Sequence, residues 1–200
     1  MAAGTALYGM VAVLAPFILA DFDISRAQLG WVLTGFAISS AVTAPLIGTI
    51  TDRIGARASV LTVFGSVAVG YVLLAGAPTY ASLFGVVVVI GIGQTMSNPA
   101  TNKMIAHEVR EGRRGLITGV KQSGVQAGTF VGGVTFPTIA DAFGWRAVPV
   151  VIAVATGTAF IVGWFVLPDH PGPAISWRVR STRGPLPPST WWITGYAFLM

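Results

Sequence analysis

The stretch that decides the fold is GTITDRIGAR, residues 48–57, which lies between two long apolar runs. Its glycines and charged side chains are Gly48, Asp52, Arg53, Gly55 and Arg57. Only 10% of the chain is charged, so three charges within ten positions form an unusual cluster. Gly55 allows a tight reversal, because glycine has no Cβ to restrict its backbone. The stretch therefore predicts a charged turn between two apolar helices.

The composition is that of a membrane protein. Hydrophobic residues make up 54% of the 200 residues, whereas a soluble domain carries about 25% charged residues. So few polar groups cannot cover the surface of a water-soluble protein. Six stretches have the length, about 20 residues, that a helix needs to cross a ~30 Å hydrocarbon core. These predicted spans are residues 1–20, 29–50, 58–77, 80–101, 115–140 and 147–167, and the predicted fold class is an all-α membrane protein with a six-helix transmembrane bundle.

Basic residues predict how the spans are oriented. With the N-terminus in the cytoplasm, the cytoplasmic segments hold nine Lys and Arg residues, and the opposite segments hold only Arg26 and Arg146. This distribution follows the positive-inside rule. We therefore expect an integral protein of the plasma (inner) membrane with a cytoplasmic N-terminus. The expected domains are a six-span bundle (1–167), a Pro- and Arg-rich cytoplasmic linker (168–190) and the truncated start of a seventh span (191–200), as in the first part of a longer protein.

The opening motif has an echo 89 positions later. DRIGARA, residues 52–58, aligns with DAFGWRA, residues 141–147, and Asp, Gly, Arg and Ala coincide. Each copy follows the second span of a set of three, and an odd number of spans gives the two sets opposite orientations. The pattern predicts two inverted three-helix repeats, which are typical of secondary transporters.

The residues of this turn carry a family resemblance. The stretch matches G-x-x-x-D-R-x-G-x-R at all five signature positions, and it resembles the loop between spans 2 and 3 of the major facilitator superfamily. The resemblance covers essentially the whole chain. It implies the N-terminal half of a 12-span transporter, with a substrate cavity between two six-span bundles. It also implies that Asp52 and Arg57 latch the bundles on the cytoplasmic side; the alternative is a topology anchor only. Arg57 can pair with Asp52 or with acidic groups of a neighbouring bundle.

The fifth predicted span partly matches a pattern of the drug-exporting branch of that family. The matching glycines are Gly115, Gly124, Gly128, Gly132 and Gly133, and Thr129 stands where the pattern has proline. We interpret these glycines first as small residues for close helix packing; efflux of drugs stays an alternative. In the fourth span, Val87 stands where proton-coupled members of the family often carry an arginine.

Polar side chains at membrane depth are functional candidates, because they are expensive to bury there. The candidate substrate-binding residues are Lys121, Gln122, Gln126, Gln94 and Asn98. Lys121 can face a water-filled cavity and meet an anion, or it can extend to the cytoplasmic headgroups. Gln94, Asn98 and Asn102 recur at every fourth position, which places them on one helix face. That stripe can line the cavity or form hydrogen bonds between helices.

The leading functional hypothesis is a secondary active transporter of a small solute by alternating access, with an organic or inorganic anion as the first guess. The alternatives are a drug or metabolite efflux antiporter, and a non-transporting membrane scaffold or sensor. We expect no enzyme activity, cofactor, metal site or nucleic-acid partner, since His107 and His170 lack ligand spacing and the basic residues form no single patch. The expected partners are a small-molecule substrate, the lipid bilayer, and a missing C-terminal half or a second copy.

Overall fold

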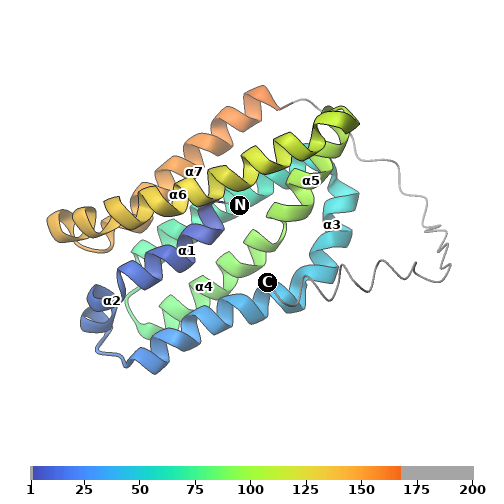
Figure 1. Cartoon of the computed structure of the whole chain (residues 1–200). Helices are drawn as coiled ribbons and strands as arrows, with labels where there is room; N and C mark the ends of the chain where they lie inside the picture. The colour runs from blue at the N-terminus through green and yellow to red at the C-terminus, as the bar shows by residue number, and fades with distance from the viewer. Residues whose placement is uncertain (1, 168–200) are drawn as a thin grey trace, which may run out of the picture.

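The computed structural model describes residues 2–167, and all their regular secondary structure is helical (Figure 1), which confirms the all-α class. The elements are α1 (Ala2–Val13), α2 (Ala15–Phe22), α3 (Arg26–Ala75), α4 (Tyr80–Thr95), α5 (Ser97–Glu108), the 3₁₀ helix η1 (Glu111–Arg113), α6 (Arg114–Phe143) and α7 (Ala147–Val166). The predicted linker and the predicted start of a seventh span lie outside the described residues.

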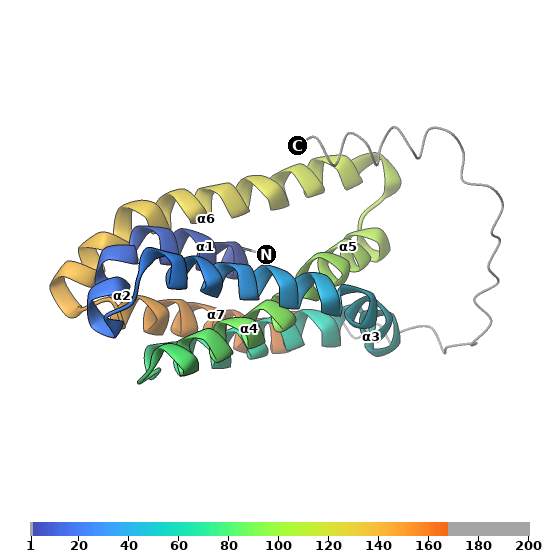
Figure 2. The same ribbon diagram turned by 90° about the horizontal axis from the view of Figure 1, so that it is seen from below.

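The helices run back and forth along one long axis. The reversal of α3 and the end of α5 lie at one end of the bundle, and α2 and the α6–α7 junction lie at the other (Figures 1 and 2). Three helical segments are long and apolar enough to cross a membrane: Arg26–Ala75, Tyr80–Ala106 and Ala147–Val166. The first has 50 residues and reverses at Gly55, so it makes two passes. With α1–α2 and α6 the bundle has six passes.

Several helix boundaries differ from the predicted ones. The charged stretch before Gly55 is helical and not a loop, and α5 continues to Glu108 through residues predicted to be a polar break. Likewise α6 continues to Phe143, which gives 30 residues, or about 45 Å at a rise of 1.5 Å per residue. This length exceeds a ~30 Å hydrocarbon core. Several charged residues of the predicted breaks, such as Asp52 and Lys103, therefore lie within helices, where hydropathy alone predicts loops.

Two helical passes contain a break close to a proline. The first pass is interrupted at Leu14, where α2 begins with Pro16 in its first turn. The fourth is interrupted at Met96 between α4 and α5, and Pro99 follows three residues later. Proline has no N–H to donate to the preceding turn, so both breaks fall where the helical ladder is already incomplete.

The predicted repeat is present in the backbone. Gly55 has φ 82° and ψ 173°, and Gly144, its partner in the 89-residue register, has φ 82° and ψ 154°. Among residues 2–167 these are the two glycines with positive φ. Only glycine adopts this region without strain. The shared Gly of the two motifs therefore makes the same sharp reversal in both halves of the bundle.

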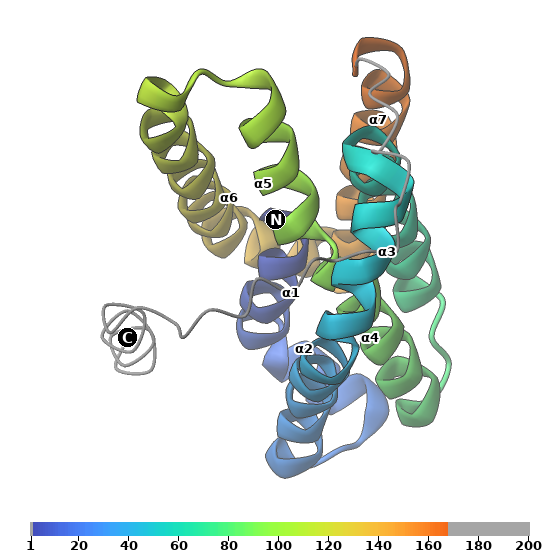
Figure 3. The same cartoon turned by 90° about the vertical axis from the view of Figure 1, so that its right-hand side faces the viewer.

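Small residues bring the helices of the core together. Gly91 lies so close to the second pass that an added Cβ would come within 2.8 Å of the Phe36 carbonyl oxygen. Ser40 donates to the Gly91 carbonyl (2.9 Å), and Ser39 donates to the Val88 carbonyl (3.1 Å). Hydroxyls and small residues are what allows close packing of helices within lipid. Figure 3 shows α7 beside α3 and α6 on the far side of the bundle from α4.

The centre of the bundle is apolar, and Val87 belongs to it. Tyr71, Leu7, Val87 and Val148 are fully buried and come from four different passes. Val87 occupies the position where the family resemblance allowed an arginine, and it packs into this cluster. Large apolar side chains also face outward, as Phe165 does with 81% exposure. An apolar exterior over an apolar centre is typical of a membrane bundle.

Candidate functional site

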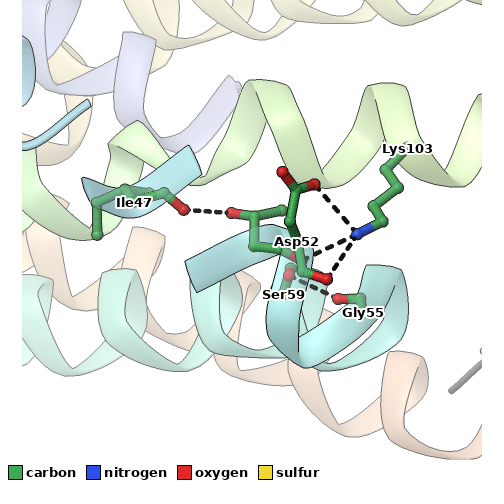
Figure 4. Close-up of polar contacts among 6 residues, drawn as sticks. Ile47, Asp52, Gly55, Ser59 and Lys103 are labelled. Carbon is green, nitrogen blue, oxygen red and sulfur yellow. Dashed lines mark hydrogen bonds and ion pairs between the residues drawn. The ribbon is translucent and has the colours of Figure 1, made fainter. Parts of the chain in front are cut away.

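The signature turn is fixed by its own backbone and by two hydroxyls. Before the turn, Thr51 donates to the Ile47 carbonyl (2.8 Å), and after it Ser59 donates to the Gly55 carbonyl (2.6 Å) (Figure 4). Both hydroxyl residues are buried. The turn therefore has a defined shape on which the charged side chains are placed.

Asp52 is paired with a lysine from a different pass. Lys103 of α5 lies 3.3 Å from Asp52 Oδ1 and 3.2 Å from the backbone carbonyls of Thr51 and Asp52 (Figure 4). A cation among the last carbonyls of a helix is stabilised by the helix dipole. The Asp52 side chain is 79% exposed and that of Lys103 only 17%. The pair therefore ties the second pass to the fourth and leaves the carboxylate accessible to a neighbour.

Arg57 contacts the sixth pass. Between the described side chains it forms no ion pair with Asp52; instead its Nη2 donates to the Trp164 carbonyl (2.6 Å) near the end of α7. Its guanidinium also lies over the Trp164 ring, 5.5 Å from the centroid. Arg57 thus holds the end of the sixth pass. Arg53 and Gly48 lie nearby, Arg53 exposed and Gly48 half-buried.

Lys121 forms hydrogen bonds with the fourth pass. Its Nζ lies 2.8 Å from Asn102 Oδ1 and 3.3 Å from Thr101 Oγ1. The lysine is half-buried, seven residues after the start of α6, or about 10 Å along the helix. The ammonium group is therefore held between α5 and α6 by neutral oxygens.

The other candidate residues lie on α4, α5 and α6. Gln94 is half-buried at the end of α4, and Asn98 is exposed at the start of α5. Gln122 and Gln126 are both exposed on α6. The structure thus joins Lys121 to the fourth pass, while Asn98, Gln122 and Gln126 are exposed.

The glycines of α6 have free space around them within the described part of the chain. An added Cβ at Gly115, Gly124 or Gly133 would meet no atom within 4 Å, and at Gly132 it would meet the Phe136 ring. Gly128 lines an apolar hollow of about 650 Å³ between α3, α6 and α7. Close packing through these glycines would need a partner outside the described helices.

The sequence does not predict two of these contacts, Lys103 with Asp52 and Arg57 with Trp164. Lys103 was counted only as a topology charge, and 51 positions separate it from Asp52. Trp164 lies 107 positions from Arg57. No spacing rule relates residues so far apart, because their contact depends on how whole helices are rotated against each other. The repeat register gives one usable signal, since it pairs Arg57 with Arg146.

The fold and the site define an all-α membrane-embedded bundle with polar side chains on α4, α5 and α6. The chain matches the family model of the Major Facilitator Superfamily over residues 1–200. It belongs to this family, which points to a membrane transporter of small solutes rather than to an enzyme.

Several curated proteins are similar to the chain. A hexuronate transporter of Bacillus subtilis is 31% identical over 159 residues, which is 78% of this chain and 36% of that protein. A multidrug resistance protein B homolog of Mycobacterium tuberculosis is 28% identical over 76% of this chain and 28% of its own length. A probable sulfoacetate transporter of Cupriavidus necator is 27% identical over 78% and 36%. The chain thus spans between 28% and 36% of these relatives.

Proposed function

We propose that this chain is one half of a secondary active transporter that moves a small organic anion by alternating access. The observation that carries the proposal is Lys121, a half-buried cation held by Asn102 and Thr101 between α5 and α6. An ammonium group is costly to bury at membrane depth, so a lysine there is a functional candidate. Hexuronate and sulfoacetate, named for two relatives, are both organic anions.

The second bundle supplies the other wall of the cavity in this proposal, either from the rest of a longer chain or from a second copy. The protein lies in the plasma (inner) membrane with a cytoplasmic N-terminus, as the nine-to-two distribution of basic residues favours. In this proposal Asp52, whose side chain is 79% exposed on the signature turn, contacts that bundle when the cytoplasmic side closes. Binding near the midplane followed by rocking of the two bundles is the mechanism.

The test is solute flux through the full-length protein in proteoliposomes. Labelled hexuronate and sulfoacetate are the anionic probes, and a cationic dye represents drug-like substrates. We expect uptake of at least one anion. Lys121→Ala lowers this uptake about tenfold or more, since a hydrogen bond to a charged group is worth about 1.5–3 kcal/mol. Lys121→Arg retains part of it. The matched control is Arg110→Ala, which removes an exposed cation near the start of α6.

Unchanged anion uptake in Lys121→Ala would contradict the role of the lysine. The alternative of drug efflux is kept because of the relative named for multidrug resistance. Flux of the dye with no flux of either anion would favour it. A scaffold or sensor that does not transport is favoured if no solute moves while the purified protein remains folded.

A further inference from the structure

The second copy of the turn motif carries its own arginine contact. At the end of the bundle opposite the signature turn, Arg146 Nη2 donates to the Ala77 carbonyl (2.9 Å), directly after the end of α3. The same nitrogen lies 2.9 Å from Asp21 Oδ2. The guanidinium also lies over the rings of Trp145 and Phe22, at 5.2 and 5.7 Å from their centroids.

The two arginines occupy equivalent positions and make equivalent contacts. Arg57 and Arg146 are 89 residues apart, and each follows a positive-φ glycine by two residues. Arg57, in the first repeat, donates to a carbonyl at the end of α7, the third helix of the second repeat. Arg146, in the second repeat, donates to the Ala77 carbonyl, two residues after the third helix of the first repeat. The contacts are therefore reciprocal.

Each contacted carbonyl lies at the C-terminal end of a helix: Trp164 is in the last turn of α7, and Ala77 lies two residues after α3. The last four carbonyls of a helix have no intrahelical donor, and the negative end of the helix dipole attracts a cation. A planar guanidinium can hydrogen-bond to the carbonyl and stack on an aromatic ring at the same time, which an ammonium group cannot do as well. Both arginines combine these two interactions.

We propose that Arg57 and Arg146 are reciprocal clasps that bind the two three-helix repeats to each other, one at each face of the membrane. A single clasp would leave the opposite ends of the repeats free to slide apart. Two clasps at opposite ends resist that motion, so the six-span bundle moves as one unit. The proposal concerns the bundle itself and holds whatever solute the protein carries.

The test is hydrogen exchange of the full-length protein in detergent, followed by peptide mass spectrometry. Arg57→Ala speeds amide exchange about fivefold to tenfold in residues 161–167 and leaves residues 72–77 unchanged. Arg146→Ala does the reverse. The matched controls are Arg110→Ala, at the same end of the bundle as Arg57, and Arg26→Ala, at the same end as Arg146. Both control side chains are exposed. We expect the controls to exchange like the wild type at both helix ends.

The proposal is overturned if neither arginine variant changes its distant helix end, if each loosens both ends alike, or if the controls do the same. Should an alanine variant fail to fold, Arg57→Lys and Arg146→Lys carry the same test. They keep the charge and lose the planar stacking face, so about a twofold increase in exchange is expected at the same distant end. Wild-type exchange in both lysine variants would also overturn the proposal.

Discussion

The two turns of the repeat share one backbone and differ in their surroundings. At Gly55 the motif presents an exposed acid, Asp52, to which only a lysine from another pass is paired among the described residues. At Gly144 the neighbouring Trp145 is buried, with 5% exposure, and its Nε1 donates to Asp21 (3.1 Å). The repeat therefore preserves the reversal and the arginine, while the side chain after the glycine differs: Ala56 follows Gly55, and the buried Trp145, bonded to Asp21, follows Gly144.

The largest expected difference in stability between the two turns comes from replacing the tryptophans that contact the arginines, Trp145 and Trp164. Trp145→Ala removes a buried ring, which costs about 3 kcal/mol or more, whereas Trp164 is 53% exposed and Trp164→Ala costs about 1 kcal/mol, mainly its cation–π contact. Thermal unfolding in detergent measures both. Equal losses would show that the buried Trp145 ring contributes no more to stability than the exposed Trp164 ring.

The next effect concerns the glycines that make the turns. Gly55→Ala and Gly144→Ala place a Cβ at φ 82°, where a non-glycine residue costs about 1–3 kcal/mol. Both variants lower the melting temperature by similar amounts, because the backbones match. Gly48→Ala is the control, since its Cβ would meet no atom within 4 Å. A loss confined to one turn would argue against a common backbone role.

Replacing Asp21 or Asp52 gives the smallest loss of stability, and the two variants are expected to differ in kind. Asp21→Asn weakens an ion pair that is partly shielded, with Asp21 35% exposed, and costs about 1 kcal/mol. Asp52→Asn removes an exposed partner and changes stability by less than about 0.5 kcal/mol. We expect it to shift the balance between the inward- and outward-facing states instead. Distances between spin labels on the two bundles measure that shift, and a large stability loss in Asp52→Asn would contradict the exposed role.

The sequence predicts the reversals better than it predicts their partners. The Asp, Gly and Arg spacing predicts both turns and their relation, because glycine's conformational freedom is a local property. The contacts of Lys103 with Asp52 and of Arg57 with Trp164 depend on helix rotation, which no local pattern encodes. Helix ends were misplaced for another reason. Charged residues continue a helix once it leaves the hydrocarbon, so a loss of hydropathy at residues 102–108 does not end α5.

The most direct test of the account is the sidedness of the two copies of the turn. Asp52 and Asp141 are equivalent in the repeat, both are exposed, and these 200 residues contain no cysteine. Asp52→Cys and Asp141→Cys, made singly in a full-length protein without other cysteines, are treated in intact cells with a membrane-impermeant maleimide. The account predicts labelling of the Asp141 variant in intact cells and of the Asp52 variant only after permeabilisation. Labelling of both from the same side would contradict the inverted repeat.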